Sequence, residues 1–158
     1  MLIKGEFKRV TNIMVEVFDL QGRLKERVRF KNLITTVGLN LIRNALAGTL
    51  ATITDAEVRY IAVGDDNTAP ALTDTVLGNE VFRKARTSYT VGAGLLTTIW
   101  YIAPAEAVGA IEEMGWFCGP TATAAADSGS MLSRVLYSRV KTNLESIKVT
   151  RTDTIQEG

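Results

Sequence analysis

The chain has 158 residues, 46% of them hydrophobic, and a formal net charge of +1. This length suits one domain that buries roughly two thirds of its unfolded surface, so folding needs neither a disulfide nor a metal. Basic and aromatic residues do not interleave as they do on nucleic-acid platforms, and no apolar run approaches the ~20 residues that span a bilayer. We therefore expect neither nucleic acid nor a membrane as a partner.

The first 31 residues predict a basic β-hairpin. Residues 12–18 alternate apolar and polar side chains, residues 19–22 predict a turn, and residues 24–30 predict the returning strand. The region 1–31 carries a net charge of +4, against −3 for the rest of the chain. Two interpretations stand: a solvated strand face, or an electrostatic dock for an acidic neighbour. The residues of such a dock would be Lys4, Lys8, Arg9, Arg23, Lys25 and Arg27.

One α-helix is predicted at about residues 36–47. Val37 and Leu41 recur at helical spacing, Thr35 or Thr36 is suited to cap the beginning of the helix, and Gly48 stands where a helix ends. This is the one segment of the chain whose pattern favours a helix.

The rest of the chain predicts strands joined by turns of small residues. They are expected at 58–63, about 79–90, 95–103, 111–118, 130–140 and 144–154. Short strands with one early helix favour a mainly β fold, a β-sandwich or jelly-roll-like domain with an inserted helix. We expect one domain over residues 1–158, made of the hairpin region 1–31 and a helix plus sandwich at 32–158.

Groups that commonly carry catalysis are missing from the sequence. Histidine is absent, which removes the commonest general base and metal ligand. Cys118 follows Trp116 and Phe117, which favours a buried, inert thiol. No glycine-rich phosphate loop or dinucleotide fingerprint occurs. We therefore expect a protein that is not an enzyme and holds no cofactor.

The segment from Gly64 to Thr75 predicts an ordered loop with many oxygen-bearing side chains. Its Asp65, Asp66, Asn67 and Asp74 form a candidate set for calcium, which prefers oxygen ligands. The loop lacks the regular alternation and closing Glu of a helix-loop-helix calcium site, so we expect no metal. Its other interpretation is a contact surface in an assembly, through Asp65, Asp66 and Thr75.

Three motifs follow one another along the chain. They are KNLITTVGLNLIRNALAG at 31–48, YIAVGDDNTAPALTDTVLGNEVFRK at 60–84, and EMGWF at 113–117. Their order resembles a family of small virion proteins of tailed bacteriophages, whose members are variously named tail fibre, tail accessory or head-decoration proteins. Asp66 stands where the loop of the family usually has glycine.

The resemblance implies a structural component of the virion that is made in the host cytoplasm. It favours a capsid-decorating cement protein that binds copies of itself, as a homotrimer, and the major capsid protein. One alternative is a tail, neck or fibre module that binds tail proteins. The residues leave another alternative open, a carbohydrate-binding receptor module that uses the Asp65 loop or exposed aromatic residues such as Tyr89 and Trp100.

Overall fold

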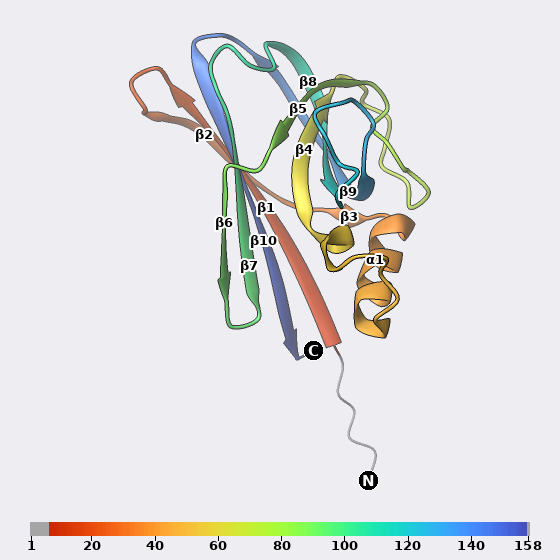
Figure 1. Cartoon of the computed structure of the whole chain (residues 1–158). Helices are drawn as coiled ribbons and strands as arrows, with labels where there is room; N and C mark the ends of the chain where they lie inside the picture. The colour runs from red at the N-terminus through yellow and green to blue at the C-terminus, as the bar shows by residue number, and fades with distance from the viewer. Residues whose placement is uncertain (1–6, 158) are drawn as a thin grey trace.

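A computed structural model describes the backbone of residues 7–157 and the side chains of residues 9–155. In this part of the chain the strands form two five-stranded antiparallel sheets with one α-helix beside them (Figure 1). Sheet A has the order β2 (Leu24–Lys31), β1 (Phe7–Asp19), β10 (Glu145–Glu157), β7 (Leu95–Ile102), β6 (Ser88–Gly92). Sheet B has the order β3 (Leu33–Ile34), β9 (Ser130–Lys141), β8 (Gly109–Cys118), β4 (Val58–Gly64), β5 (Glu80–Ala85). The predicted mainly β sandwich with one helix is confirmed.

The helix α1 (Thr36–Ala47) lies where the sequence predicts it. The Thr35 hydroxyl accepts a hydrogen bond from the Gly38 N–H at 3.1 Å, and Gly48 closes the helix in the left-handed region at φ 65°. These caps satisfy backbone groups that the ends of a helix leave without partners. A short 3-10 helix, η1 (Ile53–Ala56), follows, and the sequence pattern did not predict it.

The prediction of one strand at 79–90 was wrong, because this segment forms two strands that belong to different sheets. β5 pairs with β4 in sheet B, and β6 pairs with β7 in sheet A. Between them the Arg86 N–H donates to the Arg59 carbonyl in β4, while the Thr87 N–H donates to the Ile99 carbonyl in β7. The chain therefore crosses from one sheet to the other at these two residues, a step that alternation of side chains along a strand does not reveal.

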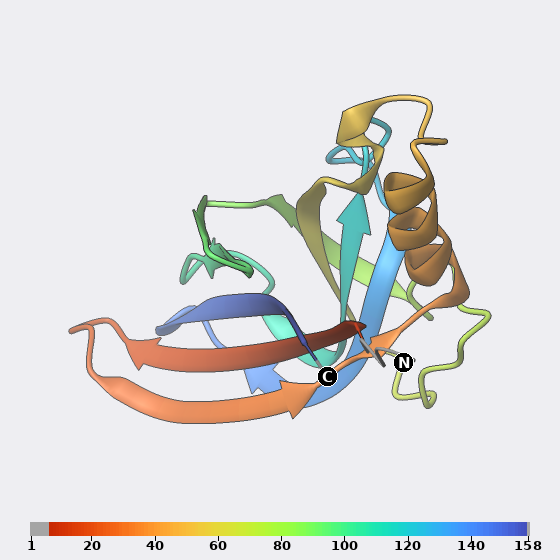
Figure 2. The same cartoon turned by 90° about the horizontal axis from the view of Figure 1, so that it is seen from below.

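The core fills the space between the sheets, whose strands run in different directions (Figure 2). Ile13, Val15 and Val17 alternate along β1 and are buried, as a strand with one covered face requires. Trp100 of sheet A meets Trp116 of sheet B edge to face, with ring centroids 6.5 Å apart. Both tryptophans are fully buried.

The two sheets separate toward the end of the sandwich where α1 lies, which we call the open end. There α1 packs on β9: the Thr35 hydroxyl donates to the Met131 carbonyl at 2.6 Å, and a Cβ at Gly38 would collide with the Leu132 carbonyl. The ends of β1, β10, β7 and β6 lie opposite the helix (Figure 1). No helix among the described residues is long and apolar enough to cross a membrane.

Candidate assembly surface

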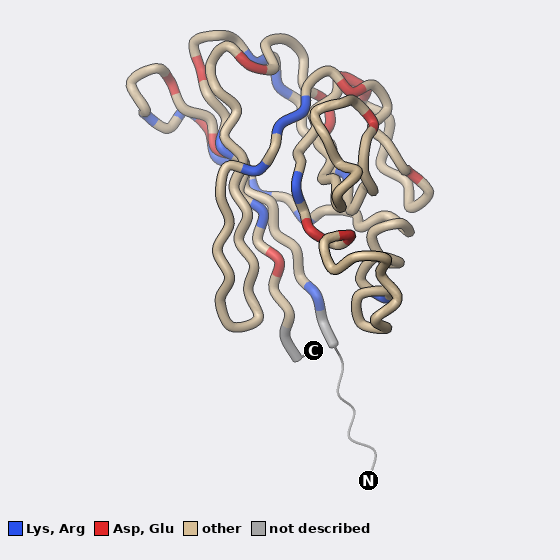
Figure 3. Tube along the Cα trace, in the orientation of Figure 1, with Lys and Arg blue, Asp and Glu red and all other residues tan. Residues whose placement is uncertain are grey.

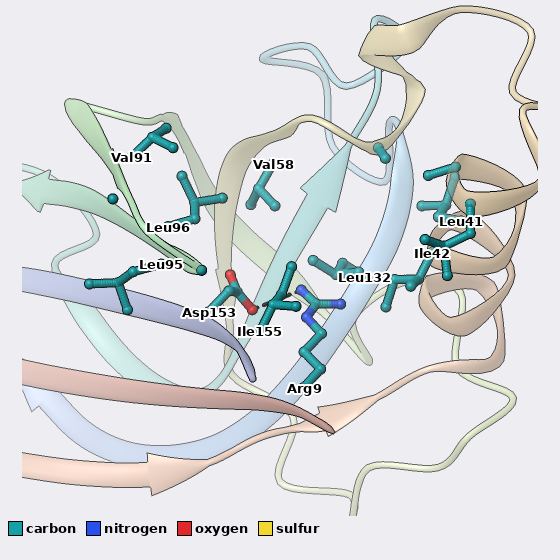
Figure 4. Close-up of a pocket in the computed structure, with 15 residues that line it drawn as sticks. Arg9, Leu41, Ile42, Val58, Val91, Leu95, Leu96, Leu132, Asp153 and Ile155 are labelled. Atoms are coloured by element: carbon teal, nitrogen blue, oxygen red, sulfur yellow. Dashed lines mark hydrogen bonds and ion pairs between the residues drawn. The ribbon is translucent and has the colours of Figure 1, made fainter. Parts of the chain in front are cut away.

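A groove of about 520 Å³ opens between α1 and the end of sheet A (Figure 4). One wall is formed by the apolar face of the helix, the floor by residues of β4 and β9, and the other wall by the ends of β6, β7 and β10. Its main apolar lining residues are Leu41, Ile42, Leu46, Val58, Val91, Leu96, Leu132 and Ile155. This size is that of a pocket that takes a small ligand or a few side chains of a partner.

The rim of this groove exposes large apolar side chains to solvent. Leu46 on α1 is 76% exposed, and Val91 on β6 is 75% exposed. Ile53 of η1 is 92% exposed and borders a neighbouring hollow that Tyr89 and Leu96 also line. Contiguous exposed apolar surface on a folded chain commonly marks a site of interaction.

The β6–β7 hairpin, which forms part of the sheet A wall of the groove, carries no charged side chain. No charged residue lies between Arg86 and Glu106, a segment that holds both β6 and β7. The hairpin of these strands is accordingly drawn without a blue or red segment (Figure 3). An uncharged surface favours association through burial of apolar area rather than through ion pairs.

An ion pair with a buried carboxylate lies at the base of the groove. The Arg9 Nη2 donates to the Asp153 Oδ1 at 2.7 Å, and Arg151 and Thr11 also donate to this carboxylate. Burial by itself would raise the pKa of Asp153, but the charges of Arg151 and Arg9 and these hydrogen bonds lower it to about 2. The Arg9 Nη1 is buried and has no hydrogen-bond partner among the described residues.

The basic residues predicted to form an electrostatic dock each contact a carboxylate of this chain, where their side chains are described. Arg9 pairs with Asp153, Arg23 with Asp19, Lys25 with Glu145 and Arg27 with Glu16, at 2.7 to 2.8 Å. Lys4 lies outside the described residues, as does the side chain of Lys8. Docking by these residues stays a prediction, and the structure places much of their charge against acidic residues of β1 and β10.

Glu145 is the centre of one of these charge clusters. The guanidinium of Arg139 donates to both of its oxygens, at 2.9 and 2.7 Å, and Lys25 adds a contact at 2.8 Å. The hydrogen bonds from Arg139, opposed by burial and reinforced by Lys25, lower the pKa of Glu145 to about 2. Arg139 also pairs with Glu26, so this cluster ties β2, β9 and β10 together.

A second cluster fixes the loop between β4 and β5 on the face of sheet B that points away from sheet A. The Arg134 Nε donates to the Glu113 Oε2 at 2.7 Å, and its Nη1 donates to the Asp74 Oδ2 at 2.7 Å. Its Nη2 donates to the Thr68 carbonyl at 2.9 Å, and the Asn79 N–H donates to Glu113 at 3.0 Å. We call these residues the Arg134 cluster. Arg134 and Glu113 are both buried.

The candidate calcium residues take part in this loop structure. Asp74 pairs with Arg134, and Asp66 accepts a hydrogen bond from the Thr68 N–H at 2.6 Å. Asp65 accepts one from the Asn79 side chain, also at 2.6 Å, while Asn67 is exposed. Among the side chains that the structure describes, no group of three or more acidic or cysteine residues is gathered closely enough to hold a metal ion.

Thr75 lies exposed in the same loop. It borders a hollow of about 350 Å³ together with Asp66, Asp74 and Arg134. The predicted loop residues are thus brought together, except that Asp65 lies on the side of the loop bonded to Asn79. Their role as an assembly contact stays a prediction.

Tyr89, Trp100 and Cys118, which the sequence analysis singled out, differ in their exposure to solvent. Trp100 is buried in the core and presents no ring to a sugar, whereas Tyr89 is exposed on β6 with the Arg86 guanidinium 4.2 Å from its ring centroid. Cys118 is buried, and burial raises the pKa of its thiol to about 12. A protonated thiol of this kind is a poor nucleophile.

Sequence reasoning missed the groove and its rim. Leu46, Val91 and Ile155 come from three distant segments, and only folding brings them to one surface. A signal was present in the uncharged stretch of residues 87–105, which is long for a half-exposed hairpin. Comparisons of the chain with protein-family models, with curated proteins and with solved structures found no match.

Proposed function

We propose that this chain is a non-enzymatic structural component of a tailed-phage virion, which works by packing against copies of itself within a larger assembly. The observation that carries the proposal is the apolar groove with its exposed rim, where Leu46 and Val91 remain three-quarters exposed in the isolated chain. Burying such surface stabilises protein association, and copies held in a symmetric lattice add cohesion through avidity.

The state of the acidic and thiol groups supports a role without catalysis. Buried Glu113, Glu145 and Asp153 are each held by an arginine, and Cys118 is protonated in the core. A general acid or base needs a pKa near the working pH, whereas the carboxyls of Glu145 and Asp153 have a pKa of about 2. These groups stabilise the fold instead.

The place in the particle rests on the order of the three sequence motifs. Capsid decoration is the role we favour, since a small domain with an apolar surface is suited to repeated contacts over a shell. A tail, neck or fibre module is the alternative, and it differs in the number of copies that a particle contains.

Quantitative mass spectrometry of purified phage particles tests this proposal. If the chain decorates the shell, each particle should contain hundreds of copies of it, counted with the portal protein as the reference. A copy number that is a small multiple of three or six would support the tail role instead of the decorating role. Absence of the chain from purified particles would overturn the proposal that it is a virion component.

A further inference from the structure

The two edges of sheet A differ in a way that bears on self-association. β2 forms one edge and carries exposed basic side chains at alternate positions, namely Lys25, Arg27, Arg29 and Lys31. β6 forms the other edge, and all five of its residues, Ser88 to Gly92, are exposed and uncharged. Natural sheets protect their edges with charge, proline or a bulge, because an unprotected edge pairs with another strand. β6 has none of these protections.

The register of the β6–β7 hairpin shows which backbone groups of β6 point away from the sheet. Gly92 pairs with Leu95 across a two-residue turn, which makes this a hydrogen-bonded pair. Such pairs alternate along an antiparallel ladder, so Gly92, Thr90 and Ser88 direct their N–H and C=O groups toward β7. Tyr89 and Val91 therefore direct theirs outward, to the open edge.

We propose that β6 pairs antiparallel with β6 of a second copy of this chain, about a two-fold axis that passes through Thr90. In this register Tyr89 lies opposite Val91 of the second copy, and Val91 lies opposite Tyr89 of the second copy. The outward N–H and C=O groups of all these residues then bond to each other. This inference rests on the proposed function, because it names the partner and the register of the self-contact.

Other registers use the edge less well. An axis through Val91 places Tyr89 opposite the turn residue Ala93, and an axis through Tyr89 places Val91 opposite Thr87. Only the axis through Thr90 overlaps the whole strand and uses every outward backbone group of both copies. It also pairs an aromatic with a β-branched side chain, a favourable combination across strands.

The surface beside β6 favours a second copy over a differently charged partner. Tyr89 and Val91 lie opposite Thr98 and Leu96, on the face of sheet A that turns toward the core and the groove. Two such edges meet without repulsion between like charges, and Arg86, which precedes the strand, is already paired with Glu57. Pairing of β6 with β2 of another copy would instead bring Arg27 and Arg29 beside exposed apolar side chains.

A disulfide across the axis tests the register. In this register Thr90 faces Thr90 of the second copy, and the two form a non-hydrogen-bonded pair because their backbone groups point toward β7. The Cα atoms of such a pair are ~4.5 Å apart, a distance that a disulfide can span. Under mild oxidation, T90C is therefore expected to form a covalent dimer. The matched control is S88C on the same exposed strand: in this register it lies about 13 Å from its counterpart, four strand residues away, and stays monomeric on a non-reducing gel. The unchanged chain, with buried Cys118, is the background.

Sedimentation of the unchanged chain provides the second measurement. Twice the monomer mass is expected at high protein concentration, with dissociation on dilution. A monomer at every concentration, a threefold mass such as the resemblance implies, or equal cross-linking of S88C and T90C would each overturn the two-fold contact. The presence of the chain in purified particles is measured independently. A failure of the two-fold contact is therefore distinguishable from a failure of the proposed function.

Discussion

The Arg134 cluster and the groove use charged and apolar side chains in opposite ways. In the cluster, Arg134 of β9 and Glu113 of β8 are buried, hydrogen-bond to each other and hold the loop between β4 and β5. At the groove, the side chains of Leu46 and Val91 are largely exposed to solvent. We therefore expect stability and the proposed association to depend on separate regions: breaking the cluster should destabilise the fold, whereas changing the groove rim should alter only binding.

The largest expected effect comes from removing the cation of the cluster. Arg134→Met leaves Glu113 buried without its partner, so the unfolding free energy should fall by about 3–5 kcal/mol. Urea unfolding followed by the fluorescence of the core residues Trp100 and Trp116 measures it.

Arg43→Met is the matched control for this change. Arg43 is exposed on α1, its guanidinium donates hydrogen bonds only to Asn44 among the described residues, and its loss should cost no more than about 0.5 kcal/mol. Equal losses at the two arginines would show that burial of the ion pair does not set the stability of this region.

A smaller effect is expected from acid at the base of the groove. Asp153 lines the groove and also stabilises the fold through its hydrogen bonds, so it belongs to both regions. Its pKa is about 2 in the folded chain against 3.8 ordinarily, so the carboxylate stabilises the fold above pH 3.8 and this contribution disappears as the pH falls toward 2. The shift corresponds to about 2 kcal/mol. Unfolding free energies measured from pH 6 to pH 2 should therefore decline less steeply for Asp153→Asn than for the unchanged chain.

Asp127→Asn serves as the control for this pH dependence, because Asp127 lies exposed in the loop between β8 and β9. The decline between pH 4 and pH 2 should be the same in this variant as in the unchanged chain. If Asp153→Asn also keeps the full decline, the acid sensitivity belongs to other carboxylates, of which Glu145 is the foremost candidate because its pKa is also lowered to about 2.

The sequence predicted the elements of the fold better than their partners. Alternation of side chains located most strands, and the caps Thr35 and Gly48 bounded the helix, because these signals are local. Nothing local indicates that β1 pairs with β10, from the other end of the chain, or that the chain changes sheets at Arg86 and Thr87. Both features have one cause: strand pairing depends on contacts between residues distant in sequence.

The same limit applied to the candidate sites. The basic side chains of the hairpin were visible in the sequence, but Asp153 and Glu145, which neutralise Arg9 and Lys25, lie more than a hundred residues away. The groove was missed because Leu46, Val91 and Ile155 each look like ordinary apolar residues of a helix or strand. Their exposure to solvent can be recognised only in the folded chain, where the two sheets separate and leave the groove uncovered.

The smallest effect on stability and the clearest effect on association are expected at Val91. Its side chain is 75% exposed, so Val91→Lys should change the unfolding free energy of the monomer by no more than about 0.5 kcal/mol. In the paired edges, however, a lysine at this position would place two cations beside apolar side chains near the two-fold axis, and sedimentation should then show a monomer. Val91→Ile keeps the apolar contact and should keep the dimer. A loss of stability for Val91→Lys as large as that for Arg134→Met would mean that β6 supports the fold, and that the two regions do not separate stability from association.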